Sequence, residues 1–431
     1  MPDLIHGNAM SAVDTVRSVA RGETSPRDVL ALAMTRIEST DGALKAFVRL
    51  ADRDEILAEL PALPGRLQGL PVAIKDNFDT ASLSTAYGSA VYRGHKPVID
   101  AAVVAALKQA GAMVVGKTAT TEFAAWPAAA TVNPHDPSHT PGGSSAGSAA
   151  SVAAGLVPVA FGTQTLGSVI RPASFCGIVG FKPSRGRIST VGIKALSESL
   201  DTVGLFARSV ADVRLVYGVL AASSEELPPD ASPIRLAYCR DANWDKADAD
   251  ARDAFLSTVA LLKQKGLSID ELPLPEGFGE VTRLGRLVHD YEMRRALLPE
   301  MRLAPDLVSP SMRAGIERAA GISAGQHAEA FAEIAAQGER LTPLLAPYDA
   351  LLTLAAPGEA PQGHAFTGDA MFNIPWTVLS MPAITLPVMK GARGLPIGLQ
   401  VVARTFEEAC LLHVAERLEG VLGEKGNAKV A

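Results

Sequence analysis

Two glycine–serine turns and one lysine are the residues of this chain whose types and spacing could do chemistry. The first turn is Gly142–Gly143–Ser144–Ser145, the second is Leu166–Gly167–Ser168, and Lys75 ends an apolar run upstream. Glycine beside serine leaves a hydroxyl uncovered and lets backbone N–H groups point toward a ligand. A hydroxyl nucleophile beside such N–H groups, with a neutral amine as its base, could cleave the bond between a carbonyl carbon and its leaving group.

Each of these residues also has a purely structural interpretation. The first turn could simply cap the helix that follows it, and Ser168 could end a strand. Lys75 could be a solvated lysine paired with Asp76. The stretch around Ser145 matches the nucleophile elbow G-x-S-x-G, which needs a strand directly before it. The preceding residues, DPSHTPGG, cannot form a strand, so we discount this match.

The histidines provide the main rival chemistry. His135 and His139, with Asp136 between them, have a spacing that suits a pair of metal ligands on a helix. Pro134 and Pro137 exclude a helix here, and no third ligand is nearby, so we predict a structural role and no bound metal. A Ser-His-Asp hydrolase that uses one of the eight histidines stays open, because no histidine sits in a motif that places it.

The elements that must position these residues alternate between strands and helices. We predict buried strands at 70–74, 113–118 and 157–163, with helices at 101–112 and 146–155. A strand–helix–strand order favours parallel pairing, so the fold class is α/β. Residues 9–60 look helical, with a helix start at Ser25 because Pro26 and Asp28 follow it.

The chain of 431 residues suits one large domain with an inserted region. We predict a single domain over 1–425, made of N-terminal helices at 1–65, a catalytic core at 66–222, a mostly helical cover region at 234–345 and a return to the core sheet at 346–421. The remaining residues, 422–431, are expected to form a flexible tail. The polar, proline-rich segment Ser223–Pro233 is the clearest internal boundary.

Composition excludes several classes of protein. The formal net charge is −6 and no basic tract is present, which disfavours binding to nucleic acid. No run approaches the roughly 20 apolar residues that a membrane span needs, and the N-terminus lacks the pattern of a secretion signal. The three cysteines are far apart and outside any C-x-x-C pair, which is typical of reduced thiols. We therefore expect a cytoplasmic protein.

Five ordered pieces of the sequence resemble the amidase signature family. They are GLPVAIKDN, NPHDPSHTPGGSSAGSAASVAAG, GTQTLGSVIRPASFCGIVGFKPS, SLDTVGLFARSVADV, and FNIPWTVLSMPAITLPV with GLPIGLQVV. The resemblance covers nearly the whole chain, from near Ser25 to the last helix. It implies a large central mixed β-sheet that is flanked by helices on both sides.

For the site, the resemblance implies a Ser–cisSer–Lys triad and no metal or cofactor. The family's catalytic lysine falls on Lys75, the proton-relaying serine that follows a cis peptide bond falls on Ser144, and the nucleophile falls on Ser168. The oxyanion hole falls on the backbone N–H groups of Thr165, Leu166, Gly167 and Ser168.

Three positions depart from the usual family pattern. Gln164 replaces an aspartate, Leu166 replaces a small residue, and Arg171 stands three places after the nucleophile instead of two. The glutamine and the arginine offset resemble the malonamidase branch, in which the arginine holds a substrate carboxylate, and some relatives of that branch resemble urethane hydrolases. We expect Arg171 and Gly143 to bind substrate, while a structural ion-pair role for Arg171 stays open.

The resemblance implies an amidase that hydrolyses a small amide through a Ser168 acyl-enzyme, with Lys75 as base and Ser144 as relay. Carbamates and aryl esters are alternative substrates, because the nucleophile meets only the carbonyl. Another alternative is the A subunit of a tRNA-dependent amidotransferase, which works with a partner. A catalytically dead binding protein is disfavoured, since all three catalytic positions are filled. We expect pocket walls from the 127–140 loop and from the helical region after residue 278, and a homodimer is compatible with the sequence.

Overall fold

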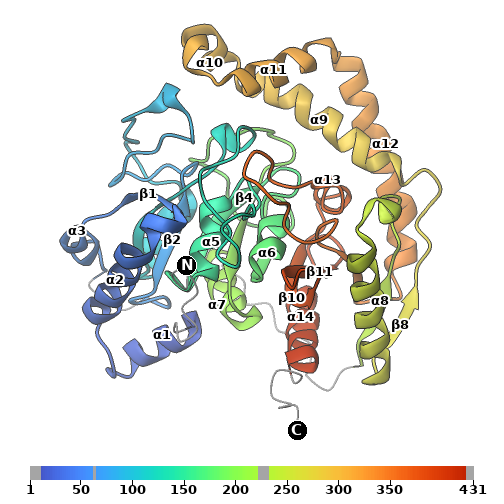
Figure 1. Ribbon diagram of the computed structural model, residues 1–431, viewed down its shortest axis with the longest axis horizontal. Helices are drawn as coiled ribbons and strands as arrows, with labels where there is room; N and C mark the ends of the chain where they lie inside the picture. Colours follow the sequence, from blue (N-terminus) through green and yellow to red (C-terminus); the bar gives the residue numbers. More distant parts are fainter. Residues whose placement is uncertain (1–10, 62–64, 222–232, 424–431) are drawn as a thin grey trace.

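The computed structural model describes residues 11–61, 65–221 and 233–423. One mixed sheet of 11 strands runs through the centre of the molecule (Figure 1). In the order in which they lie side by side, its strands are β1 (Phe47–Leu50), β3 (Met113–Thr118), β2 (Pro71–Lys75), β4 (Val159–Gln164), β6 (Thr202–Ala207), β5 (Val179–Lys182), β10 (Ala383–Lys390), β11 (Pro396–Val402), β9 (Ala350–Leu354), β7 (Arg235–Tyr238) and β8 (Ser268–Glu271).

The sheet has two parallel parts, which are separated by an antiparallel middle, and its edge strand β1 pairs antiparallel with β3. Strand β2 pairs in parallel with β3 and β4, and β7 pairs in parallel with β8 and β9. Between them, β4, β6, β5, β10, β11 and β9 pair antiparallel. Every residue of β2 and β4 is buried, as expected for parallel strands that are covered on both faces. The predicted α/β class and mixed sheet are confirmed.

Helices cover both faces of this sheet. In β5, Gly180 faces Ala173 of the helix at Ile170–Cys176, whereas Phe181 contacts Tyr217 of the helix at Val210–Leu220 on the opposite face. The described helices are α1 (Ala12–Ala20), α2 (Pro26–Leu44), α3 (Arg53–Ala58), α4 (Ala102–Gln109), α5 (Ala146–Ala153), α6 (Ile170–Cys176), α7 (Val210–Leu220), α8 (Ala249–Gln264), α9 (Glu280–Ala296), α10 (Leu298–Leu303), α11 (Pro310–Arg318), α12 (Ala324–Leu345), α13 (Ile374–Val378) and α14 (Glu408–Gly423).

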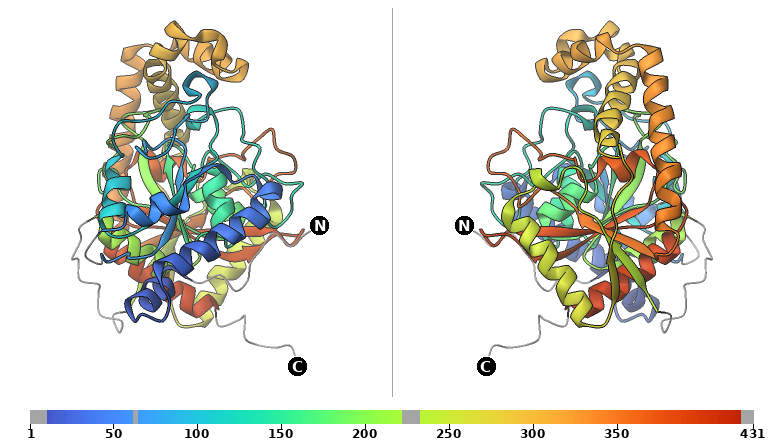
Figure 2. Two further views of the ribbon diagram at one scale, coloured as in Figure 1. Left: turned by 90° about the vertical axis from the view of Figure 1, so that its left-hand side faces the viewer. Right: turned by 90° about the vertical axis from the view of Figure 1, so that its right-hand side faces the viewer.

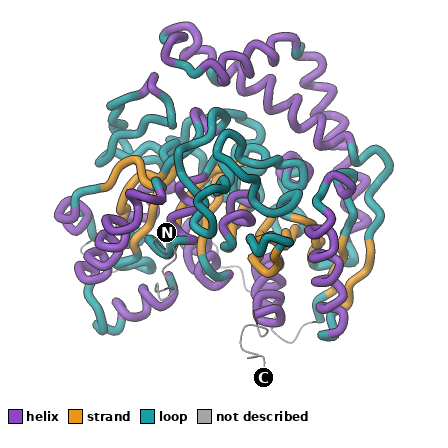
Figure 3. The backbone as a smooth tube through the Cα atoms, viewed as in Figure 1, coloured by secondary structure: helices purple, strands orange, loops and turns teal. Residues whose placement is uncertain are grey.

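Helices α9 to α12 form an arm that projects beyond the sheet, as the two side views show (Figure 2). Loops gather between this arm and the sheet (Figure 3). None of the helices in the described ranges combines the length and the apolar character that a membrane crossing needs.

The predicted start of α2 is confirmed in detail. The Ser25 hydroxyl oxygen accepts the N–H of Asp28 at 3.1 Å, and the Asp28 carboxylate accepts from the Ser25 hydroxyl at 2.6 Å. Pro26 takes the first helical position, where a missing N–H has no cost. Local sequence alone is sufficient to set this boundary.

Two segments that were predicted to be helical contain strands. Residues 9–60 include β1, because the Asp41 carboxylate accepts the N–H groups of Ala46 and Phe47 after α2 ends, and the chain then pairs with β3. The cover region 234–345 includes β8, which pairs in parallel with β7. Each strand is held by a partner strand elsewhere in the chain, so local propensity could not reveal it.

Some predicted features lie outside the described residues. The boundary at Ser223–Pro233 is described only at its last residue, and the tail is described only at 422 and 423, which belong to α14. Strand β6 is an element that the sequence analysis does not predict.

A pair of glycine-to-alanine variants tests how closely α5 packs. In Gly147→Ala the new Cβ would lie 2.2 Å from the carbonyl oxygen of Ala46 and 2.5 Å from the nitrogen of Ala119, so we expect a loss of roughly 1–3 kcal/mol. Gly42 in α2 has nothing within 4 Å of such a Cβ, so Gly42→Ala should gain up to about 1 kcal/mol. Thermal unfolding of both variants checks this, and equal shifts in melting temperature would contradict it.

Candidate active site

Lys75 lies at the carboxyl end of β2 and is completely buried. Its Nζ lies 2.8 Å from Ser144 Oγ and 2.9 Å from Thr163 Oγ1. Burial lowers the pKa of Lys75 to about 7, against the smaller opposing effect of the Asp201 carboxylate. Because a hydroxyl can donate as well as accept, a neutral Lys75 can accept the hydrogen of Ser144.

The backbone around Ser144 places its hydroxyl toward Lys75. The peptide bond between Gly143 and Ser144 is cis. Gly142 has a φ of +85°, and a Cβ there would lie 2.7 Å from Cα of Pro172 in α6. The neighbouring Ser145 instead donates its hydroxyl to the buried carbonyl oxygen of Thr163 at 3.3 Å. No strand precedes this serine, in agreement with our rejection of the nucleophile elbow.

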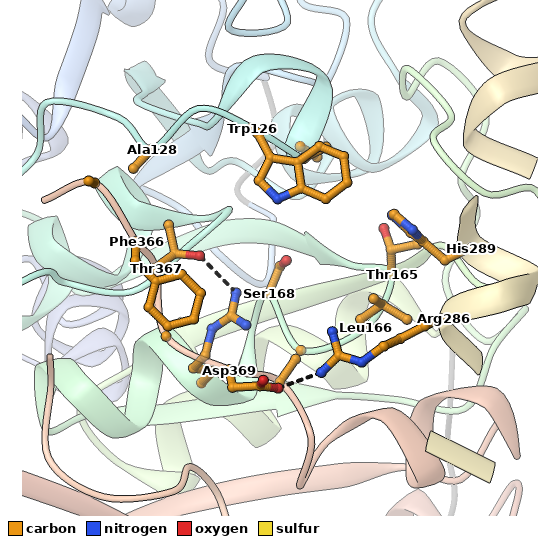
Figure 4. Close-up of a pocket in the computed structure, with 17 residues that line it drawn as sticks. Trp126, Ala128, Thr165, Leu166, Ser168, Arg286, His289, Phe366, Thr367 and Asp369 are labelled. Atoms are coloured by element: carbon orange, nitrogen blue, oxygen red, sulfur yellow. Dashed lines mark hydrogen bonds and ion pairs between the residues drawn. The ribbon is translucent and has the colours of Figure 1, made fainter. Parts of the chain in front are cut away.

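Ser168 lies in the turn between β4 and α6 and lines a pocket (Figure 4). Lys75 and Ser144 form a hydrogen bond with each other. Among the described residues, Ser168 forms no hydrogen bond with Lys75 or with Ser144. Within the described ranges no other side chain forms a hydrogen bond with the Ser168 hydroxyl either, so it is available to a substrate in the pocket.

Four successive backbone N–H groups belong to the same turn as this hydroxyl. The backbone N–H groups of residues 165–168 donate to no other group in the part of the chain that the structure describes. Gly167 is needed in this turn, since a Cβ there would lie 2.5 Å from Asn373 Oδ1 and 2.7 Å from Ala370 Cβ. Unpaired N–H groups beside a hydroxyl can stabilise negative charge on a reacting oxygen.

Gln164 fixes the shape of this turn. Its Oε1 accepts the N–H groups of Val169 at 2.9 Å and Ile170 at 3.0 Å, and its Nε2 donates to Thr377 Oγ1 at 2.9 Å. The Thr377 hydroxyl in turn lies 3.0 Å from the carbonyl oxygen of Leu166. An aspartate at this position would be one methylene shorter and would have no N–H for Thr377, so the departure at Gln164 has a physical role here.

Asp201 stabilises the turn that carries Ser168 through hydrogen bonds of its carboxylate. One of its oxygens accepts the Thr165 hydroxyl at 2.6 Å, and the other accepts the N–H groups of Leu196 at 2.7 Å and Ser197 at 3.1 Å. Burial raises the pKa of Asp201, and these hydrogen bonds oppose that effect. Its carboxylate is also the charged group that acts on Lys75.

Arg171 contacts both the protein and the pocket. Its Nη2 donates to the carbonyl oxygen of Gly143 at 2.6 Å and to Thr367 Oγ1 at 3.3 Å, while Nε is buried without a partner in the described chain. Burial lowers the pKa of Arg171 to about 10, which leaves it positively charged at neutral pH. The residue therefore holds the peptide before Ser144 and also lines the pocket.

The pocket has a volume of about 150 Å³. Its walls come from the 165–168 turn, the segment 124–128, the loop 365–370, and Arg286 and His289 of α9. Arg286 pairs with Asp369 at 2.6 Å and so joins α9 to the loop (Figure 4). The expected contribution of the region after residue 278 is present, but only Ala128 represents the 127–140 loop.

The cluster at 135–139 does not form a single site. The His135 ring lies 2.9 Å from the carbonyl oxygen of Cys176, whereas His139 pairs with Asp136 at 3.0 Å. Within the described ranges, no group of three or more histidine, cysteine, aspartate or glutamate side chains could hold a metal ion. These contacts fit the structural role that the sequence predicts.

A family model for amidases matches residues 28–412 of the chain. The chain belongs to the amidase family. This match confirms the resemblance to the amidase signature family, whose members act on carbon–nitrogen bonds. A crystal structure of an amidase superposes on the chain with a TM-score of 0.88 at 30% sequence identity, covering 96% of this chain and 100% of that one.

The curated relatives of highest similarity include A subunits of glutamyl-tRNA(Gln) amidotransferase. The subunit of Thermus thermophilus is 40% identical over 282 residues, which are 60% of this chain and 59% of that one. The subunit of Anaeromyxobacter sp. (strain K) is 32% identical over 468 residues and aligns over 94% of both chains. These relatives do not place the chain in the malonamidase or urethanase branch.

Several residues of the site are not predicted by the sequence analysis. Thr163 and Asp201 lie within pieces that carry the family resemblance, but their partners are distant in sequence. The loop at 365–370 follows the core strand β9 and is rich in small and polar residues, which is typical of loops that carry binding groups. His289 stands on the buried apolar face of α9 beside Val288, so helical spacing could have placed it toward the interior, whereas nothing local indicates that Arg286 meets the pocket.

Replacing Gln164 tests the support of the turn. Gln164→Leu removes three hydrogen bonds and leaves buried N–H groups unpaired, so we expect a loss of roughly 2–4 kcal/mol in stability and a fall in amidase activity of at least about tenfold. Gln337→Leu is the matched control, because Gln337 is equally buried but lies in α12 away from the pocket. Activity and melting temperature of both variants check this, and full activity in Gln164→Leu would contradict it.

Proposed function

We propose that this amidase-family chain hydrolyses a small amide that carries a carboxylate, through an acyl-enzyme on Ser168. The observation that carries the proposal is the buried Lys75, whose pKa is lowered to about 7 and whose two partners are hydroxyl groups. Such an amine can exist in its neutral form near neutral pH and accept a proton from a neighbour.

A second buried lysine shows why the partners matter. Burial also lowers the pKa of Lys182 to about 7, but its Nζ contacts the carbonyl oxygens of Pro183 and Met381. Carbonyl oxygens only accept hydrogen bonds, so Lys182 can donate to them but can take no proton from them. Of these two lysines, only Lys75 has partners from which it could take a proton as a base.

The proposed reaction begins when the Ser168 oxygen attacks the substrate carbonyl carbon. Ser168 passes its proton to Ser144, and Ser144 passes its own proton to neutral Lys75. The negative charge that forms on the carbonyl oxygen is stabilised by the unpaired N–H groups of residues 165–168. The carbon–nitrogen bond then breaks, and the same relay returns a proton to the leaving amine.

The acyl-enzyme is hydrolysed by reversing the roles. A water molecule attacks the ester carbonyl, loses its proton through Ser144 to Lys75, and releases the acid while Ser168 regains its hydrogen. Thr163 supports this cycle, since its hydroxyl oxygen accepts from both Lys75 and Asn77 and so fixes the amine beside Ser144.

The pocket favours a small, anionic substrate. Its volume of about 150 Å³ suits an acyl group of a few atoms. Arg286 is neutralised by Asp369, whereas no carboxylate forms an ion pair with Arg171 among the described residues. Arg171 and the adjacent Gly143 are therefore proposed to bind the substrate. Carbamates and aryl esters with similar acyl groups are further proposals, because Ser168 would attack the same carbonyl.

A second candidate function is the A subunit of a tRNA-dependent amidotransferase. The curated relatives support this candidate more strongly than a stand-alone amidase, since they are such subunits and align over most of the chain. In that role the same triad would release ammonia from an amide for use by a partner subunit. Both candidates therefore depend on amide hydrolysis at Ser168.

The pH dependence tests the roles of Ser168 and Lys75. Because the base must be neutral, kcat at saturating substrate should rise about tenfold per pH unit below the Lys75 pKa of about 7 and level off above it. Ser168→Ala should abolish turnover, and Lys75→Ala should lose most of it. Lys182→Met is the control and should keep the pH profile. Turnover in Ser168→Ala, or a flat profile through neutral pH, would sink the assignment.

A substrate comparison separates the two candidate functions. Purified chain alone should hydrolyse malonamate faster than a neutral aryl amide, an aryl carbamate or a p-nitrophenyl ester, and Arg171→Ala should lose malonamate selectively. Hydrolysis that appears only when a second subunit co-purifies would favour the amidotransferase instead. Preference for the neutral aryl amide or carbamate would contradict the carboxylate requirement.

A further inference from the structure

One histidine of the pocket, His289, has a ring nitrogen that forms no hydrogen bond with the described residues. His289 is buried in α9, and its Nδ1 lies 2.8 Å from Asp290 Oδ1. A carboxylate only accepts hydrogen bonds, so Nδ1 carries the hydrogen. The other nitrogen, Nε2, contacts no polar group among the described residues, yet it is not sealed in the interior, and the ring lines the pocket.

The ring is also held in a fixed orientation. It packs edge-on against Trp126 with 6.2 Å between ring centroids and an interplanar angle of 88°. Figure 4 shows His289 on the same side of the pocket as Thr165, and Trp126 over the pocket. A carboxylate and an aromatic neighbour thus hold the ring in one orientation at the wall of the pocket that contains Ser168.

The charged groups around His289 come from several elements. Its own helix contributes Asp290 and Arg286, the segment before β6 contributes the Asp201 carboxylate, and the loop 365–370 contributes Asp369, which is paired with Arg286. Arg171 lines the same pocket from α6. Asp369 already neutralises Arg286, so Arg171 and His289 are the side chains of this pocket that could carry a positive charge toward a substrate anion.

We propose that His289 is a specificity-determining residue of this pocket, which donates its Nε2–H to the carboxylate of the substrate. The inference rests on the proposed function, since it concerns the same pocket, and it assigns a second recognition group besides Arg171. In this arrangement Asp290 accepts from Nδ1 while the substrate carboxylate accepts from Nε2, and both stabilise the imidazolium. Where the ring is neutral in the free protein, binding of the carboxylate draws one proton from the buffer.

Binding measurements on Ser168→Ala test this without turnover. The probes are malonamate and malonamide, which have nearly the same size and differ in that malonamide has a neutral amide in place of the carboxylate. Isothermal calorimetry in two buffers with different ionisation enthalpies measures both affinity and proton uptake. We expect Ser168→Ala to prefer malonamate, with an affinity that falls as pH rises and with uptake of a fraction of a proton on binding.

Adding His289→Phe should keep the packing against Trp126 but lose the hydrogen bond. We expect malonamate to bind at least about tenfold more weakly, malonamide to change little, and the proton uptake to disappear. His289→Gln keeps a donor without the charge, so it should retain part of the affinity but lose the pH dependence. The control is His327→Phe, because His327 pairs with Glu292 in the arm and is not among the residues that line this pocket.

Three results would overturn the proposal. These are equal losses for malonamate and malonamide in His289→Phe, proton uptake that persists in that variant, and failure of malonamate to bind Ser168→Ala. The proposed function fails separately, if Ser168→Ala still hydrolyses amides in a kinetic assay. Melting temperatures show whether each variant is folded. If His289→Phe does not fold, His289→Gln tests the proposal independently.

Discussion

The burial of one amine beside two hydroxyl groups is the constraint on which the site depends. Removing Lys75 from water disfavours its charged form, and no carboxylate in the described chain lies close enough to form an ion pair with it. The partners left to it are Ser144 and Thr163, which can each change between donor and acceptor. A site of this kind requires dense packing around the end of β2, and the buried strands on either side supply it.

The turn that carries Ser168 depends on segments from distant parts of the chain. Gln164 connects it to α13, and Asp201 connects it to the segment before β6. These groups satisfy the polar atoms at the edges of the turn and leave its central N–H groups unpaired. Free N–H groups in a buried turn are costly unless a ligand uses them, and this cost supports the proposal that they bind a substrate oxygen.

The chemistry and the choice of substrate come from different layers of the molecule. The sheet and α5 and α6 hold the groups that would react, whereas the arm and the loop at 365–370 form the outer wall of the pocket. Relatives that share the fold or the sequence of this chain include both an amidase and amidotransferase subunits. The family therefore follows from the core, and the substrate must be sought in Arg171, His289 and the Arg286–Asp369 pair.

The sequence by itself determined the fold class, the main core strands and the start of α2, because each rests on local composition or on an ordered family pattern. The same family pattern proposes Lys75, Ser144 and Ser168 as the catalytic residues. The sequence did not reveal β1 or β8, whose hydrogen bonds come from β3 and β7. Only the tertiary structure decided that Thr163 and Asp201 support the site, that Arg171 holds the carbonyl of Gly143, and that His289 lines the pocket. Burial, pKa shifts and long-range hydrogen bonds depend on what packs around a residue, and that information is spread over segments far apart in the chain.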